Sequence, residues 1–187
     1  MQQDQNATDK WRTKKRFSGA RGKRMSLFER TDYFWRETYF VFFREKKRPK
    51  TADLKRLVRS LGERFELVEA VGDQQGYFES LTLLAPADFA GLDVVYCRGE
   101  DIDAEKHELI EDLERTAASA QAKHKLELLR QSDARFEVFH FEHVVPDDEE
   151  EYDELERLDP GGLLTLLAKL AEYTGGVIVD PQAAEFL

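Results

Sequence analysis

Two segments of this sequence place apolar side chains on both faces of a β-strand, and this feature restricts the fold more than any other. In residues 37–43 the aromatic and β-branched residues occupy odd and even positions alike: Tyr39, Phe40, Val41, Phe42 and Phe43. Residues 135–143 repeat the pattern with Phe136, Val138, Phe139 and Phe141. Successive side chains of a strand point to opposite faces, so such strands belong in a sheet that is covered on both sides.

The other apolar patterns predict the elements around these two strands. A helix is expected over 51–61, where Leu54, Leu57, Val58 and Leu61 form one stripe. A long helix over 103–130 carries the stripe Leu109, Leu113, Ala117, Ala120, His124 and Leu128. Further strands are expected at 64–71 and 77–84, joined by a hairpin loop at 72–76, and at 93–97 and 177–179. A largely apolar and therefore buried helix is expected at 161–173.

This order predicts an α+β fold with a ferredoxin-like βαββαβ core, followed by an extra C-terminal helix and strand. We expect helices 51–61 and 103–130 on one face of the sheet, with helix 161–173 or a second subunit on the other. The chain has 187 residues, which suits one domain, expected over 26–187. Residues 1–25 are polar and lack apolar periodicity, so they are expected to form a disordered, flexible basic arm.

Composition excludes several classes of protein. No apolar run reaches the roughly 18 residues of a membrane-spanning helix, and the polar start predicts no secretory signal. The single cysteine, Cys97, permits no internal disulfide and fits a reducing compartment, so a cytoplasmic location is expected. Thirteen Phe, six Tyr and two Trp argue against global disorder.

The overall net charge of −10 conceals a strong asymmetry along the chain. Residues 1–60 contain 18 Lys/Arg and 7 Asp/Glu, whereas residues 61–187 contain 10 and 31. The first third is therefore basic and the remainder acidic, with the densest acidic run at 147–156. Such asymmetry favours an anionic binding partner for the basic part.

Binding of a nucleic acid is the function that this basic part favours most. Lys and Arg neutralise phosphates, and interleaved aromatic residues stack on exposed bases, which favours RNA or a ribonucleoprotein over DNA. The expected nucleic-acid-binding residues are Trp11, Arg12, Lys14, Lys15, Arg16, Phe17, Arg21, Lys23, Arg24, Lys46, Lys47, Arg48 and Lys50. The signature of an RNA-recognition motif is absent, so we expect binding without sequence-specific readout. The expected protein is a non-catalytic interaction module.

Two alternatives remain open at this stage. The basic arm could dock on the acidic run 147–156, on a partner protein or on a second copy of the chain, because a tethered segment meets its own anions at high effective concentration. The chain could also be a small enzyme whose site has no sequence signature, since catalytic residues are brought together by the fold.

Catalytic and metal-binding patterns are weak. His140 and Glu142 share one face of the expected strand, but His143 points away, so the three do not converge on a metal. His107 and Glu111 are four residues apart on a helix, which more commonly indicates an exposed pair. No phosphate-binding glycine loop or nucleophile motif occurs, and Cys97 has no histidine nearby in sequence. We therefore expect no cofactor, metal or catalytic residue.

Overall fold

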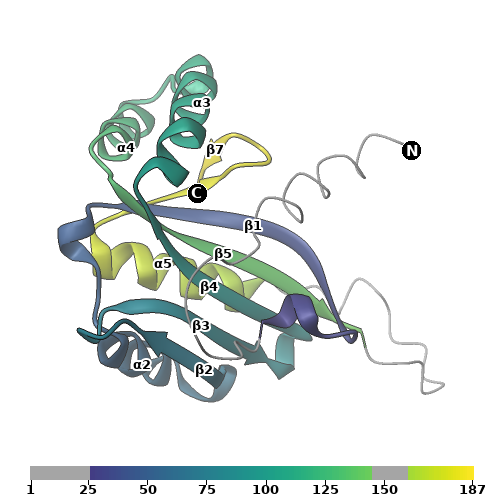
Figure 1. Cartoon of the computed structure of the whole chain (residues 1–187). Coiled ribbons are helices and arrows are strands. Elements are labelled where there is room, and N and C mark those ends of the chain that lie inside the picture. Colours follow the sequence, from purple (N-terminus) through teal and green to yellow (C-terminus); the bar gives the residue numbers. More distant parts are fainter. Residues whose placement is uncertain (1–25, 145–159) are drawn as a thin grey trace.

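The computed structural model describes residues 26–144 and 160–187, which form an α+β fold around one seven-stranded sheet (Figure 1). Its strands are β1 (Tyr33–Phe43), β2 (Glu66–Gly72), β3 (Phe78–Ala85), β4 (Ala90–Arg98), β5 (Ala134–His143), β6 (Val177–Asp180) and β7 (Glu185–Phe186). The α-helices are α2 (Thr51–Ser60), α3 (Glu100–Thr116), α4 (Ala120–Arg130) and α5 (Gly161–Thr174). Four 3-10 helices are η1 (Leu27–Glu29), η2 (Glu45–Lys47), η3 (Gly62–Arg64) and η4 (Pro86–Asp88).

The strands follow the order β2-β3-β4-β5-β1-β6-β7, and every described pair of neighbours is antiparallel. A ferredoxin-like core places its first strand beside its third. Here β1 lies between β5 and β6, while β3 lies between β2 and β4. The α+β class is therefore confirmed, whereas the ferredoxin-like arrangement of the strands is not.

One face of the sheet is covered by α2 and α5. Leu54 and Val58 of α2 and the leucines of α5 pack against the odd-numbered residues of β1, including Val41. Figure 1 shows β4 and β5 passing in front of α5. The apolar α5 is buried at Leu163, Leu166, Leu167 and Leu170, as its composition predicts. The helix at 51–60 thus shares its face with α5 and not with the helices of 100–130, which corrects the expected layering.

The opposite face is covered in part by α3 and α4. Phe40 and Phe42 of β1 are fully buried beneath Leu109, Leu113, Leu126 and Leu129. The long helix expected over 103–130 is interrupted at 117–119, where Ser119 caps α4 by accepting the backbone N–H of Ala122 at 3.0 Å. This break rotates α4, so Leu126 and Leu129 point inward and His124 is exposed.

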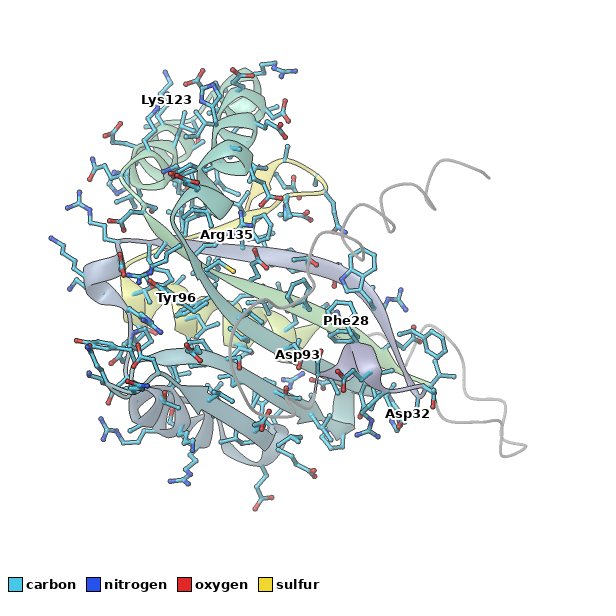
Figure 2. All side chains as sticks on the ribbon, viewed as in Figure 1. Phe28, Asp32, Asp93, Tyr96, Lys123 and Arg135 are labelled. Atoms are coloured by element: carbon cyan, nitrogen blue, oxygen red, sulfur yellow. The ribbon has the colours of Figure 1, made fainter. Side chains whose placement is uncertain are left out.

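Asp93 of β4 holds the first described residues of the chain on this second face. Its carboxylate accepts the Ser26 hydroxyl at 2.8 Å, the Leu27 backbone N–H at 3.0 Å and the Thr82 hydroxyl at 2.7 Å. Burial raises the pKa of Asp93, although these three donors favour its charged form. Next to it, Phe28 packs edge-on against Phe139 and Phe141 (Figure 2).

Candidate nucleic-acid interface

The basic segment that follows β1 forms a short loop at one end of the sheet. Phe43 ends the strand, η2 follows directly, and the buried Pro49 leads into α2. Lys46 and Lys47 lie on η2 and are exposed. Within residues 26–144 and 160–187, neither lysine side chain forms an ion pair or a hydrogen bond, and both side chains are exposed to solvent.

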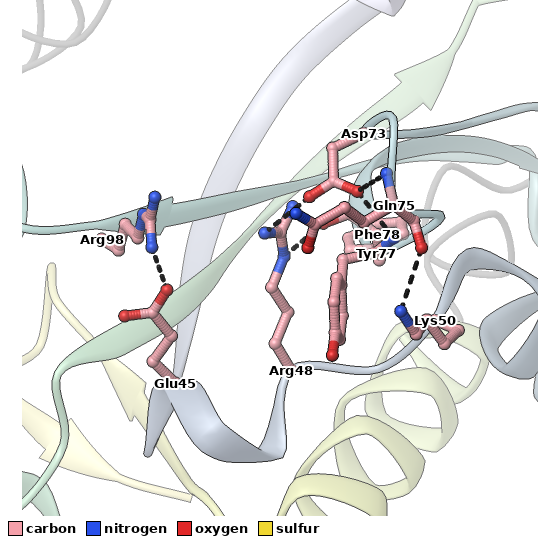
Figure 3. A network of polar contacts seen from close by, with 8 residues as sticks. All are labelled: Glu45, Arg48, Lys50, Asp73, Gln75, Tyr77, Phe78 and Arg98. Carbon is pink, nitrogen blue, oxygen red and sulfur yellow. Dashed lines mark hydrogen bonds and ion pairs between the residues drawn. The ribbon is translucent and has the colours of Figure 1, made fainter.

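Arg48 is held by the protein itself (Figure 3). Its Nε donates to the carbonyl oxygen of Phe78 at 2.9 Å, and Nη1 lies 3.1 Å from Oδ2 of Asp73. The guanidinium also lies 4.0 Å from the ring centroid of Tyr96. Only 12% of the Arg48 side chain is exposed, because the hairpin loop and Tyr96 surround it.

Lys50 belongs to the same network. Its Nζ donates to the carbonyl oxygen of Gln75 at 3.0 Å and lies 3.2 Å from the ring centroid of Tyr77. Asp73 completes the hairpin loop by accepting the backbone N–H groups of Gln75 and Tyr77, both at 2.9 Å. Burial alone would raise the pKa of Asp73, but these amides and the positive charge of Arg48 hold it below its usual value.

Two further arginines at this end of the sheet are paired. Arg44 donates to the side-chain oxygen of Gln131, and Arg98 forms an ion pair with Glu45. Burial raises the pKa of the neighbouring Tyr96 to about 12, and the charge of Glu45 adds to this effect. The basic side chains at this end of the sheet therefore form two groups. One group is held by partners in the protein, namely the hairpin loop, Gln131 or Glu45. The other group consists of the solvent-facing Lys46 and Lys47.

The outer face of α2 extends the exposed positive charge. Arg56 and Arg59 are exposed and Lys55 is half-buried, opposite the buried Leu54 and Val58. Arg56 pairs with Asp53 at 2.5 Å, but three quarters of its side chain remains exposed. The helix thus adds to the exposed positive charge that Lys46 and Lys47 carry on the loop before it.

The structure tests none of the thirteen predicted contacts with a nucleic acid, and it describes only four of these residues. Nine of the thirteen, from Trp11 to Arg24, lie outside the described residues, as does the acidic run 147–156. Of the four that are described, the structure exposes Lys46 and Lys47 and holds Arg48 and Lys50 in the network of Figure 3.

The sequence analysis missed a buried ion cluster beneath α3. Arg135, 2% exposed, donates to Glu137 at 2.6 and 3.1 Å, pairs with Glu105 and lies 3.9 Å from the ring centroid of Phe40 (Figure 2). Burial opposes the charge of Arg135, but the two carboxylates outweigh it and raise the arginine pKa. The available signal was the spacing of Arg135 and Glu137, because two residues that are two positions apart on a strand lie on one face.

A second polar cluster joins β1 to β5. Nδ1 of His140 lies 2.9 Å from one carboxylate oxygen of Glu37, and the Tyr39 hydroxyl donates to the other at 3.1 Å. The hydrogen bond with His140 lowers the pKa of Glu37, and burial raises that of Tyr39. His143 instead stacks on Tyr33, so His140 and His143 do not converge.

These groups do not amount to a recognisable catalytic or metal centre. In the described part of the chain, no three His, Cys, Asp or Glu side chains are placed to hold a metal ion. The exposed His107 and Glu111 lie 3.3 Å apart as a surface pair on α3. Among the helices at 26–144 and 160–187, none is long and apolar enough to cross a membrane.

Comparisons with protein-family models, curated proteins and solved structures find no match for this chain.

Proposed function

We propose that this protein is a non-catalytic interaction module that binds a polyanion, with RNA or a ribonucleoprotein favoured over DNA. The observation that carries the proposal is the segregation of charge: residues 1–60 contain 18 Lys/Arg and 7 Asp/Glu, against 10 and 31 in the remainder. The exposed Lys46 and Lys47 supply positive charge on the folded part. Arg48 and Lys50 remain in the proposed contact set, although a phosphate would have to compete there with Asp73, Phe78 and Gln75.

The preference for RNA rests on the aromatic residues between the basic ones. Trp11 and Phe17 stand among eight Lys/Arg in residues 10–24. An aromatic ring stacks on a base only where that base is unstacked, as in single strands and loops. Duplex DNA offers the phosphates alone, so its affinity should be lower at equal salt.

The test is a salt titration of binding to a labelled single-stranded oligouridine, measured by fluorescence anisotropy with the full chain. The variant Lys14→Gln, Lys15→Gln, Arg16→Gln should bind more weakly, and the slope of log affinity against log salt should fall by about 2, at about 0.7 per phosphate contact. The matched control Arg115→Gln, Lys123→Gln, Arg130→Gln removes the same charge from exposed positions of α3 and α4.

The outcomes separate the alternatives. The proposal is supported if the first variant binds the oligouridine more weakly than the parent chain while the control variant binds it with the parent's affinity. Absence of binding by the parent chain at about 50 mM salt, where phosphate contacts are strong, overturns it. Equal loss in both variants also overturns it, because affinity would then follow net charge and not the basic segment.

A further inference from the structure

The first half of β1 has an open outer edge in the part of the chain that the structure describes. β6 pairs with β1 only from Phe40 to Phe42 and ends at Asp180. The other edge of β1 is paired with β5 along its whole length. Figure 1 shows the first half of β1 running on past β7. An unpaired strand edge of this kind is a template for pairing with another strand.

The hydrogen bonding to β5 determines which backbone groups point to this open edge. The backbone N–H of Val144 donates to the carbonyl oxygen of Asp32 at 3.0 Å. Hydrogen-bonded and non-hydrogen-bonded pairs alternate along an antiparallel ladder, so Phe34 also bonds to β5, whereas Tyr33 and Trp35 do not. The N–H and C=O groups of Tyr33 and Trp35 therefore point outward. Among the described residues, no strand pairs with them on that side.

The side chains of the open edge place an apolar ring between opposite charges. Phe34 exposes 55% of its surface, more than any other large apolar side chain of the described residues. Arg36 lies on the same face of the sheet, because it forms an ion pair with Glu142, which is paired with Phe34 in the ladder. Asp32 comes two positions before Phe34 and Arg36 two positions after it. The edge therefore has an anion at one end and a cation at the other.

This edge is complementary to itself when a second copy of the chain pairs with it antiparallel. With Phe34 opposite Phe34 of the second copy, Tyr33 lies opposite Trp35 of that copy, and Asp32 lies opposite Arg36. The outward groups of Tyr33 and Trp35 then form two hydrogen-bonded pairs, each of which exchanges both N–H···O bonds. The two Phe34 rings meet in a non-hydrogen-bonded pair, where side chains are closest. A shift of the register by two residues loses one of the two hydrogen-bonded pairs and both contacts between opposite charges.

We propose that two copies of this chain form a dimer through the open edge of β1, paired antiparallel and centred on Phe34. The contact covers the exposed ring and satisfies the outward backbone groups. It is short, because the ladder shifts between Trp35 and Glu37, so a weak and reversible dimer is expected. Arg36 also keeps its ion pair with Glu142 in the same copy, since a guanidinium has five N–H donors.

Sedimentation-velocity ultracentrifugation of the full chain, from about 1 μM to about 1 mM, tests the dimer. The unaltered chain should change from monomer to dimer within this range. Phe34→Lys places two ammonium groups opposite each other and should raise the dissociation constant about tenfold or more. The matched control Val68→Lys, at an exposed apolar position of the other edge strand β2, should leave the dissociation constant unchanged.

Exchange of the charges at Asp32 and Arg36 tests the register. Asp32→Lys and Arg36→Asp each place like charges opposite one another, so each variant alone should dimerise more weakly than the parent. An equimolar mixture of the two variants should form a heterodimer with an affinity close to the parent's, because every contact then joins opposite charges. Mixing cannot repair a folding defect of either variant, so recovery reports contact between copies.

Three outcomes overturn the proposal. The first is a parent chain that stays monomeric up to about 1 mM, as it would if another part of the same chain covered the edge. The second is a dimer that Phe34→Lys leaves unchanged, because it would use another surface. The third is a mixture that dimerises no better than its components. The samples contain no polyanion, so these outcomes leave the proposed function to its own test.

Discussion

Replacing Arg48 distinguishes a structural from a binding role at the basic end of the sheet. Arg48→Ala removes a charged donor from the Phe78 carbonyl, an ion pair with Asp73 and a contact with the Tyr96 ring. Lys47→Ala, one position earlier, removes one positive charge from an exposed site. The two variants change the net charge equally, so a difference in stability between them reports the contacts of Arg48.

The size of the effect follows from these contacts. A hydrogen bond from a charged donor contributes about 1.5–3 kcal/mol. The cation–π contact at 4.0 Å adds about 0.5–1 kcal/mol, and a partly exposed ion pair adds less than about 1 kcal/mol. Because neighbouring terms do not add fully, Arg48→Ala should lower the free energy of unfolding by about 2–4 kcal/mol. Lys47→Ala should stay within about 0.5 kcal/mol of the parent.

Urea denaturation followed by circular dichroism measures both values, provided that the slope m is unchanged. Arg48→Lys should recover only part of the loss, because a single ammonium cannot reproduce the fork that reaches both Phe78 and Asp73. The reasoning is refuted if Arg48→Ala is as stable as Lys47→Ala, or if Arg48→Lys equals the parent.

Two further predictions concern the ion pair of Arg64 with Asp88 and the hydrogen bond of His140 with Glu37. Gly162→Ala should lower the free energy of unfolding by about 1–3 kcal/mol, because the new Cβ would lie 2.2 Å from an Asp88 oxygen that Arg64 holds at 2.9 Å; parent-like stability in urea would contradict this. Because His140 lowers the pKa of Glu37 from its usual 4.5, the pair stabilises the fold above that pH and loses this contribution as pH falls. Glu37→Gln should therefore make stability less dependent on pH below about 4.5, and an unchanged acid denaturation curve would exclude this role.

Local patterns in the sequence predict most elements of this fold. The strand expected at 135–143 is found at 134–143, and the helix expected at 161–173 at 161–174, because periodicity depends on neighbouring residues alone. The interruption at 117–119 was missed because Ala117 and Ala120 continue the apolar stripe, although Ser119 is a favourable helix cap. β7 has two residues, too few for any pattern to indicate.

Strand order could not be obtained in the same way. Nothing near β1 in the sequence specifies that it lies between β5 and β6, since this choice depends on packing against distant α5, α3 and α4. The same limit applies to the basic loop. Arg48 and Lys47 are adjacent cations in the sequence, and only the approach of Asp73 and Tyr96, 25 or more positions away, gives them different roles.

The central position of β1 affects the order in which the chain can fold during synthesis. β2, β3 and β4 are consecutive in the sequence and adjacent in the sheet, so their pairing needs no later part of the chain. β1 emerges before them, yet its ladder with β5 joins residues about 100 positions apart, and its other edge waits for β6. This eleven-residue strand therefore cannot form its ladder until β5, about 100 positions later, has been synthesised. The dense positive charges at 10–24 and 44–50 flank it on both sides and oppose its association with other nascent chains.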